Sequence, residues 1–391
     1  MQLAFTPEQD ALRRELRDYF TAMMTPEVEA EMARHEMGGP LSRELARKMG
    51  ADGWLGVGWP KEYGGQDRSP LEQLVFFDEA SRAGAPVPLL TINSVGPTLM
   101  RYGSDDQKRE FLPQILGGEI QFAIGYSEPG AGTDLASLKT RAVRDGDEYV
   151  IDGQKIFTSL ADLSDYVWLA VRTNPDAPKH KGISILIVPT SAPGFSLSPI
   201  RIVGGGRTNM TFYDNVRVPV TARVGDENEG WKLITTQLNH ERVALCNSGM
   251  LSRNLNDVRV WAARTRRADG TRVIDQEWVQ VNLARVAARV EFLKLMNWKV
   301  AWGLTTGALA PTDASVTKVF GTELNLEVYR LLMEVIGPAA YLKRDTPGAV
   351  LRGRLERAYA GNLILTFGGG TNEIQRDIVS MVGLGMPRAP R

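Results

Sequence analysis

The spacing of apolar residues changes twice along this 391-residue chain, and these changes constrain the folds that it can adopt. Residues 1 to 120 carry apolar side chains at helical intervals, whereas residues 121 to 225 contain short β-branched and aromatic runs bounded by turn residues. Long helical spacing returns in residues 226 to 391 and favours an antiparallel bundle. The pattern predicts an α+β protein with an N-terminal α-helical domain, a middle β-barrel or sandwich domain and a C-terminal four-helix bundle.

The same periodicities predict individual elements. Helices are expected at 7–23, 41–52, 70–84, 90–102, 105–116, 231–264, 276–307, 312–336 and 350–366, with a last helix after a Gly-rich turn. Strands are expected at 122–126, 149–151, 166–171, 183–188 and 215–219. Thr6, Pro7 and Gln9 have the spacing of a capped helix start with a capping box. The tryptophan rings are expected to fill the cores, as at Trp278 and Trp302.

Charge and composition exclude several classes of protein. The 46 basic and 46 acidic residues balance, so no electrostatic footprint for nucleic acid is present. The single Cys246 excludes an internal disulfide and fits a reducing compartment. No signal peptide is recognisable, and no apolar run reaches the roughly 18–20 residues of a membrane span. We therefore expect a cytoplasmic protein that binds neither nucleic acid nor membrane. His35, His180 and His240 lack metal-ligand spacing, so no metal site is expected.

One carboxylate lies on an apolar helix face. Glu241 is three residues after Leu238 and four before Leu245, on a stripe that begins at Trp231 and Ile234. An ionised carboxylate that faces a core is costly unless it is paired, and burial raises its pKa. Such a group is a candidate general base. The alternative, an ion pair with Arg242 or another cation, is the commoner fate of a lone Glu on such a stripe.

Two Gly-rich loops are candidate binding segments. The first, Ser127-Glu-Pro-Gly-Ala-Gly-Thr-Asp134, follows a predicted strand and could grip a phosphate, a pyrophosphate or the edge of a heterocycle. It matches neither the Rossmann fingerprint nor the P-loop, and a plain turn explains it equally well. The second, Phe367-Gly-Gly-Gly-Thr-Asn-Glu-Ile-Gln-Arg376, runs into a helix where Asn372 and Gln375 have capping-box spacing. Its free N–H groups could bind an anion or a carbonyl oxygen, or the loop could be only a hinge.

Together these segments resemble the acyl-CoA dehydrogenase family over nearly the whole chain. The motifs are the Glu-Pro-Gly-Ala-Gly-Thr-Asp134 loop, Asp152-Gly-Gln-Lys155, Gly182-Ile-Ser, Asp214-Asn-Val-Arg-Val-Pro219, Gly230-Trp and Gly370-Thr-Asn-Glu-Ile-Gln-Arg376. The resemblance implies FAD bound between the β domain and the bundle. It also implies removal of the α-proton of an acyl-CoA thioester, with hydride passing from Cβ to flavin N5.

The resemblance also assigns the base. The family's catalytic Glu occupies one of two positions, and the commoner one, in the C-terminal loop, is Gly369 here. The other position precedes an Arg on the first bundle helix, and Glu241-Arg242 matches it. The resemblance therefore implies that Glu241 is the catalytic base and that Arg242 contacts the CoA portion. It implies that the Gly369 N–H polarises the thioester carbonyl.

Flavin contacts are carried over from the resemblance position by position. They are Ile124, Tyr126 and Ser127 along the isoalloxazine, Gly132 and Thr133 near the pyrophosphate, Phe157 stacked on the ring, Ser159 near N5, and Thr371 and Glu373 from the C-terminal loop. Phe157 replaces the family's usual Trp, and Ser159 replaces its usual Thr.

The chain departs from the family pattern in the segments that homotetrameric relatives lend to a neighbour's FAD. These segments read Arg266-Arg-Ala-Asp-Gly270 and Glu334-Val-Ile-Gly-Pro-Ala-Ala340 here. An aromatic has become Asp269, and two glycines have become Pro338 and Ala340. The departures predict an α2β2 heterotetramer in which a homologous acyl-CoA dehydrogenase subunit supplies the missing contacts.

A narrower resemblance concerns the substrate. Segments 231–245, 84–88 and 366–371 look like the catalytic subunit of actinobacterial steroid side-chain acyl-CoA dehydrogenases. This implies a sterol side-chain thioester of the 3-oxocholest-4-en-26-oyl type as substrate and an electron-transfer flavoprotein as acceptor. Two alternatives stay open: an acyl-CoA oxidase that uses oxygen, and a non-catalytic scaffolding subunit of a flavoprotein complex.

Overall fold

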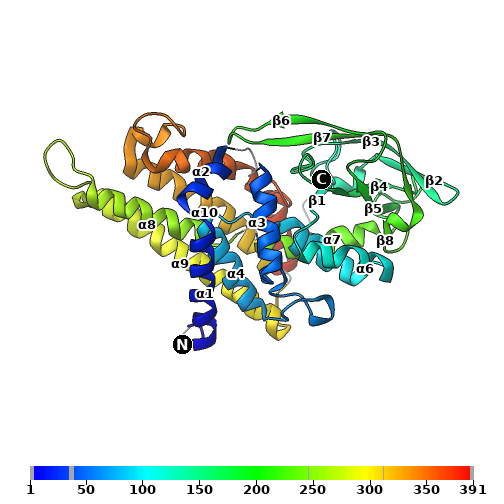
Figure 1. The fold of residues 1–391 in the computed structure, drawn as a ribbon, viewed down its shortest axis with the longest axis horizontal. Helices are drawn as coiled ribbons and strands as arrows, with labels where there is room; N and C mark the ends of the chain where they lie inside the picture. Colours follow the sequence, from blue (N-terminus) through cyan, green and yellow to red (C-terminus); the bar gives the residue numbers. More distant parts are fainter. Residues whose placement is uncertain (1–3, 35–38, 245, 311, 388–391) are drawn as a thin grey trace.

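The computed structural model describes residues 4–34, 39–244, 246–310 and 312–387, with the backbone alone described for residues 238–244. Two helical regions and one sheet make up the molecule, and the sheet forms one end of it (Figure 1). The long helices α8 to α10 extend away from the sheet toward the opposite end. This arrangement has the three parts that the sequence predicts: N-terminal helices, a middle β region and C-terminal helices.

The N-terminal helices follow the predicted periodicity closely. They are α1 (Pro7–Met23), α2 (Pro26–Arg34), α3 (Gly39–Ala51), α4 (Pro70–Ala83), α5 (Gly96–Tyr102) and α6 (Asp105–Leu116). The capping box at Thr6 and Gln9 is confirmed. The region predicted as one helix over 90–102 instead begins with a π-helical turn, Thr91–Val95, that leads into α5. The sequence analysis did not predict α2, none of whose side chains is buried.

The middle region is one eight-stranded sheet. Its strands are β1 (Phe122–Gly125), β2 (Arg141–Asp145), β3 (Glu148–Lys155), β4 (Tyr166–Arg172), β5 (Ile183–Pro189), β6 (Phe195–Arg201), β7 (Arg207–Pro219) and β8 (Arg223–Val224). The strand order is β6-β7-β3-β2-β4-β5-β8, and β1 pairs with β4 in parallel. Strands β2, β6 and β8 were not predicted. Most side chains of β2 and β6 are exposed and carry little apolar signal, and β8 has only 2 residues.

The C-terminal helices are α7 (Gly230–Ala244), α8 (Gly249–Arg264), α9 (Glu277–Thr306), α10 (Asp313–Ile336), α11 (Arg354–Asn362) and α12 (Asn372–Ile378). The single helix predicted over 231–264 is wrong, since α7 and α8 are separate. A Cβ on Gly249 would lie 1.9 Å from the Asp78 carbonyl oxygen, so the chain passes directly against α4 here. Asp78 Oδ1 also accepts hydrogen bonds from Ser248 N and Oγ, both at 2.8 Å. The predicted helix over 350–366 is α11 with short 3-10 turns at both ends.

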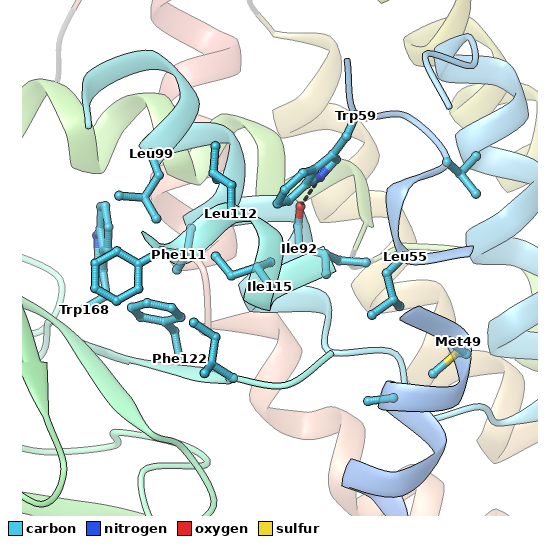
Figure 2. Close-up of a cluster of buried hydrophobic side chains, with 14 of the residues drawn as sticks. Met49, Leu55, Trp59, Ile92, Leu99, Phe111, Leu112, Ile115, Phe122 and Trp168 are labelled. Atoms are coloured by element: carbon cyan, nitrogen blue, oxygen red, sulfur yellow. Dashed lines mark hydrogen bonds between the residues drawn. The ribbon is translucent and has the colours of Figure 1, made fainter. Parts of the chain in front are cut away.

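One hydrophobic core joins the N-terminal helices to the sheet. Figure 2 shows side chains from these helices, among them Leu99 and Phe111, packed beside Phe122 of β1 and Trp168 of β4. Trp59 Nε1 donates to the Ile92 carbonyl oxygen at 2.9 Å within this core. The same core includes Leu233 and Ile234 of α7. The helix predicted to carry the base is therefore packed against both the helical region and the sheet.

Helix α9 leaves an apolar face exposed. Trp278 is 50% exposed and Trp302 is 56% exposed, so their prediction as core residues is wrong. Phe292 and Leu295 lie on the same helix and are also exposed. The apolar pattern correctly indicated a helix, but only one face of α9 packs in the bundle and the other does not. Within the described ranges, no helix is long and apolar enough to cross a membrane.

Candidate active site

The loop after β1 presents open backbone. Ser127 accepts a hydrogen bond on its carbonyl oxygen from Ile156 N at 2.8 Å, which joins this loop to the segment after β3. Glu128 and Ala131 exchange two backbone hydrogen bonds, at 2.9 and 3.0 Å. A Cβ at Gly130 or Gly132 would meet nothing within 4 Å. The exposed backbone that the sequence predicts for these two glycines is thus confirmed, and it leaves room for a ligand to approach.

A buried ion pair anchors this loop. Lys155, at the end of β3, is 0% exposed, and its Nζ lies 2.8 Å from Glu128 Oε1 and 3.1 Å from the Tyr126 carbonyl oxygen. Glu128 also accepts hydrogen bonds from the backbone N of Lys139 and Thr140, at 2.6 and 2.8 Å. A buried carboxylate with this many donors is satisfied. The pair holds the segments that contain Tyr126 and Phe157 in one arrangement.

Burial and ion pairing shift the pKa of each of these two groups in opposite directions. Burial lowers the pKa of Lys155 to about 8, although Glu128 favours its charged form. Burial alone would raise the pKa of Glu128, but Lys155 and the hydrogen-bond donors hold it below its usual value. The ionised pair is the state that the contacts satisfy.

Phe157 stands in a conformation that a bulky residue rarely adopts. Its φ is +61°, in the left-handed region, and its ring is 57% exposed. Ser159 N donates to the Phe157 carbonyl oxygen at 2.9 Å, and Ser159 Oγ lies 3.1 Å from Thr208 Oγ1. Strain of this kind persists where the surrounding structure enforces it, and it clusters at functional sites. The result is an exposed aromatic ring held beside the open loop.

Helix α7 contacts the loop through a buried amide. Tyr126 Oη donates to Gln237 Oε1, and Trp168 Nε1 donates to Tyr126 Oη at 3.2 Å. The described backbone of α7 continues past Gln237 to Ala244 and so includes positions 241 and 242. The side chains of Glu241 and Arg242 lie outside the described residues, and their roles stay predictions.

The second Gly-rich loop is also held by a buried lysine. Lys318 of α10 is 0% exposed, and its Nζ donates to the carbonyl oxygens of Thr366 and Gly370 at 3.2 and 2.7 Å, and to Asn372 Oδ1 at 2.8 Å. Gly369 and Gly370 have φ of +65° and +93°. A residue with a side chain at 369 would be strained there. The loop geometry therefore favours glycine at the position where the family more often has its catalytic Glu.

The helix after this loop is capped by a different residue from the one predicted. Thr371 is the N-cap of α12, and its Oγ1 accepts from Ile374 N at 3.2 Å. Asn372 is instead buried and turned toward α10, where Thr322 Oγ1 lies 3.1 Å from its Nδ2. Glu373 is exposed. The hydrogen bonds of the described residues do not join Thr371 or Glu373 to the sheet.

Cys246 links the end of α7 to the lysine that holds this loop. Its Sγ lies 3.9 Å from the Lys318 carbonyl oxygen, and its own carbonyl oxygen accepts from Asn297 Nδ2 at 2.8 Å. Burial raises the pKa of the Cys246 thiol to about 12. Cys246 therefore stays a protonated packing residue near neutral pH and is no candidate nucleophile.

Some of the residues that organise the site were not singled out from the sequence. Gln237 and Lys318 are buried polar groups in helices with apolar periodicity, and Glu128 is a buried carboxylate in the first Gly-rich loop. That periodicity drew attention only to Glu241, although the same reasoning applies to Gln237, three residues after Ile234. Among the residues that the structure describes, no group of His, Cys, Asp and Glu has the arrangement of a metal site.

One of the two segments that depart from the family pattern lies far from the sheet. The turn between α8 and α9 projects from the end of the molecule opposite the strands (Figure 1). Within this turn, Asp269 accepts from Thr271 N at 2.9 Å and pairs with Arg267 at 2.8 Å. Pro338 and Ala340 form part of a 3-10 turn, Gly337–Tyr341, that follows α10. Neither segment contributes to the loops described above.

Comparison with known families matches the chain in three consecutive parts. Residues 6–119 match the acyl-CoA dehydrogenase N-terminal domain, residues 123–216 the middle domain, and residues 228–384 the C-terminal domain. Both Gly-rich loops and α7 fall inside these matches.

Individual relatives match over the full length. The chain is 60% identical to acyl-CoA dehydrogenase FadE26 of Mycobacterium tuberculosis and 48% identical to acyl-CoA dehydrogenase FadE29 of the same organism, with 100% of both chains covered in each case. The crystal structure of the ChsE4-ChsE5 complex from Mycobacterium tuberculosis has a TM-score of 0.94 at 60% identity, with full coverage of both chains. The Tcur3481-Tcur3483 steroid ACAD has a TM-score of 0.94 at 53% identity, also with full coverage. With the fold, both loops and the whole length matched, the chain belongs to the acyl-CoA dehydrogenase family and is an acyl-CoA dehydrogenase.

Proposed function

We propose that this chain catalyses FAD-dependent α,β-dehydrogenation of an acyl-CoA thioester, with Glu241 as the base. The observation that carries the proposal is Phe157, an exposed aromatic ring in a left-handed backbone conformation beside open glycine backbone. A flat aromatic cofactor would cover that ring and account for both its exposure and its strain. Members of this family typically depend on FAD.

The residues present suit this cofactor. Gly132 and Thr133 offer open backbone and a hydroxyl group for the pyrophosphate, in a loop whose Cβ space is empty at both glycines. Ile124, Tyr126, Ser127, Phe157 and Ser159 would line the ring system, and Thr371 and Glu373 would complete the pocket. When bound, FAD supplies the acceptor for the hydride that leaves the substrate Cβ.

The protein's own contribution is to position and deprotonate the thioester. The Glu241 carboxylate takes the α-proton, and the Gly369 N–H donates to the thioester oxygen as negative charge develops there. Lys318 supports this second role, because its 2.7 Å hydrogen bond to the carbonyl oxygen of Gly370, the following residue, anchors the loop that contains that N–H. Arg242 contacts the CoA portion.

The finer proposal concerns substrate and assembly. We infer a sterol side-chain thioester as substrate and an α2β2 complex in which this chain is the catalytic subunit. The likeness to the Tcur3481-Tcur3483 steroid ACAD supports the substrate class, and the likeness to the ChsE4-ChsE5 complex supports a heteromer. The exposed apolar face of α9, with Trp278 and Trp302, is consistent with coverage by another chain.

The test is Glu241→Gln in the assembled complex, with Glu62→Gln as control because Glu62 is exposed and distant from the site in the chain. Removal of a general base is expected to lower turnover by about a hundred- to ten-thousand-fold, since such groups contribute that much. The control should keep wild-type turnover. A Glu241→Gln complex with most of its turnover would favour another base or the scaffolding alternative.

Two further measurements address substrate and acceptor. The complex should oxidise a steroid side-chain CoA thioester in preference to short straight-chain acyl-CoAs, and the opposite preference would reject the sterol assignment. Electron-transfer flavoprotein should support turnover without oxygen consumption. Stoichiometric oxygen consumption would establish the oxidase alternative instead.

A further inference from the structure

The loop after β3, residues 156–165, contains two residues in a strained backbone conformation. Phe157 has a φ of +61° and Leu160 a φ of +66°, so both are left-handed. Bulky apolar residues rarely adopt this region, which Gly, Asn and Asp tolerate far better. Strain of this kind persists only where the surrounding structure imposes it. Contacts from another part of the fold must therefore hold the loop.

Strand β7 supplies such contacts. Strand β3 ends at Lys155, opposite Thr211, whereas β7 begins at Arg207 and pairs along its other edge with β6. The loop lies against the first residues of β7. Thr158 N donates to the Asn209 carbonyl oxygen at 2.9 Å, and Asn209 Nδ2 donates to the Thr158 carbonyl oxygen at 3.3 Å. The strand thus holds the loop through both backbone and side-chain atoms.

Asp162 joins the far part of this loop to the same strand. Its Oδ2 accepts from Arg207 Nε at 2.7 Å, and its Oδ1 accepts from Asn209 Nδ2 at 2.9 Å. Successive side chains of a strand alternate, so Arg207 and Asn209 share one face of β7 and Thr208 lies on the other. Thr208 Oγ1 in turn lies 3.1 Å from Ser159 Oγ. We call Asp162, Arg207 and Asn209 the Asp162 clamp.

The Asp162 clamp is well shielded and its polarity is defined. The Asp162 side chain is 12% exposed, and Asn209 is 0% exposed. Both partners of Asn209 Nδ2, the Asp162 carboxylate and the Thr158 carbonyl, can only accept, which fixes the orientation of the amide. Hydrogen bonds to an ionised carboxylate are stronger than those between neutral groups. Asp162 is therefore a strong attachment point for the loop.

We propose that Asp162 is a positioning residue for the flavin site. The Asp162 clamp holds Phe157 and Leu160 in their left-handed conformations, and it thereby fixes the Phe157 ring and the Ser159 hydroxyl group where the cofactor would bind. The inference rests on the proposed FAD binding. The ion pair between Lys155 and Glu128 anchors the start of this loop, and the Asp162 clamp anchors the part that follows the two flavin contacts.

The experiment compares the assembled complex with its Asp162→Asn and Arg207→Lys variants. Asparagine keeps the shape of Asp162 but presents a donor where two donors already converge. Lysine keeps the charge of Arg207 but loses the Nε donor. Loss of charge-assisted hydrogen bonds should raise the dissociation constant for FAD by about tenfold in Asp162→Asn. The visible circular dichroism of the bound flavin should change in both variants, because the ring and hydroxyl group beside it move.

A matched control lies at the other end of β7. Asp145 of β2 pairs with Arg217 of β7 at 3.0 Å, away from the loop after β3. Asp145→Asn makes the same chemical change and also removes a carboxylate from an arginine of this strand. It should keep the wild-type dissociation constant for FAD and the wild-type dichroism. An equal change in Asp145→Asn would overturn the proposal, since the effect would then not depend on the loop.

A second readout does not require flavin. Amide hydrogens of residues 156–165 should exchange with deuterium faster in the flavin-free Asp162→Asn and Arg207→Lys complexes than in the wild type. Wild-type exchange together with wild-type dichroism, in whichever variant folds, would overturn the proposal. A loss of stability with unchanged dichroism would also overturn it, because Asp162 would then only stabilise the fold. Failure of the proposed function has a different signature: the wild-type complex itself would bind no FAD.

Discussion

The end of the molecule that contains the sheet and the far end, which contains the turn between α8 and α9, differ in how their candidate cofactor-contact residues are buried and paired. At the sheet end, a lysine with 0% exposure pairs with Glu128 and fixes the segments around Tyr126 and Phe157. At the far end, Asp269 sits in an exposed turn and is satisfied by its own neighbours Thr271 and Arg267. A buried ion pair needs good geometry to be tolerated, whereas an exposed turn has no such constraint. The contrast is the one expected if, as proposed, the chain keeps the contacts to its own cofactor and has lost those that it would lend.

The largest expected effect follows from breaking the anchor at the sheet end. Lys155→Met leaves the buried Glu128 carboxylate without its cation and should cost about 3–5 kcal/mol of the free energy of unfolding. The loop should loosen and flavin should be lost on dilution. Chemical unfolding and flavin absorbance measure both.

The control for this change is an exposed ion pair that also involves a carboxylate of the loop after β1. Lys179 pairs with Asp134 at 2.8 Å, but both side chains are more than half exposed. Lys179→Met should therefore cost less than about 1 kcal/mol. Glu128→Gln combined with Lys155→Met should recover part of the loss, since it removes the unpaired charge. Equal stability of the Lys155 and Lys179 variants would contradict the role given to the anchor.

The smallest expected effect is at the far end. Asp269→Ala should leave the thermal midpoint and the flavin content of the complex unchanged, because the hydrogen bonds of Asp269 stay within its own exposed turn. Thermal unfolding and the ratio of flavin to protein absorbance test this. Loss of flavin from the Asp269→Ala complex would show that the far end still serves a cofactor site, and the contrast between the two ends would fail.

The sequence predicts the three-part fold well because periodicity reports local burial. The bounds of α1 and α6 agree with prediction, and the Thr6 capping box forms as expected. Prediction from the sequence fails where tertiary contacts determine the local structure. The break between α7 and α8 depends on the close approach of Gly249 to α4, which no local pattern encodes. The exposure of Trp278 and Trp302 likewise depends on which face of α9 is covered.

The candidate site was likewise predicted from local composition, but not where it depends on tertiary contacts. The loop after β1 and the glycines before α12 could be identified as candidate binding segments from their composition. The residues that hold them, Glu128 and Lys318, act through contacts to backbone atoms that are distant in sequence. Thr371 rather than Asn372 caps α12, because the Asn372 side chain is used by Lys318 instead. Glu241 was singled out by its place on the stripe, and its side chain lies outside the described residues.

The most direct test of a chain that holds its own half of the cofactor site is its flavin content and native mass, first alone and then with a homologous subunit. We expect poorly flavinated protein when the chain is expressed alone. The heteromer proposal predicts a yellow α2β2 complex, with turnover, when the partner is present. A stoichiometrically flavinated, active homotetramer of this chain alone would contradict it, because the departures at Asp269, Pro338 and Ala340 would then be compensated within the chain itself.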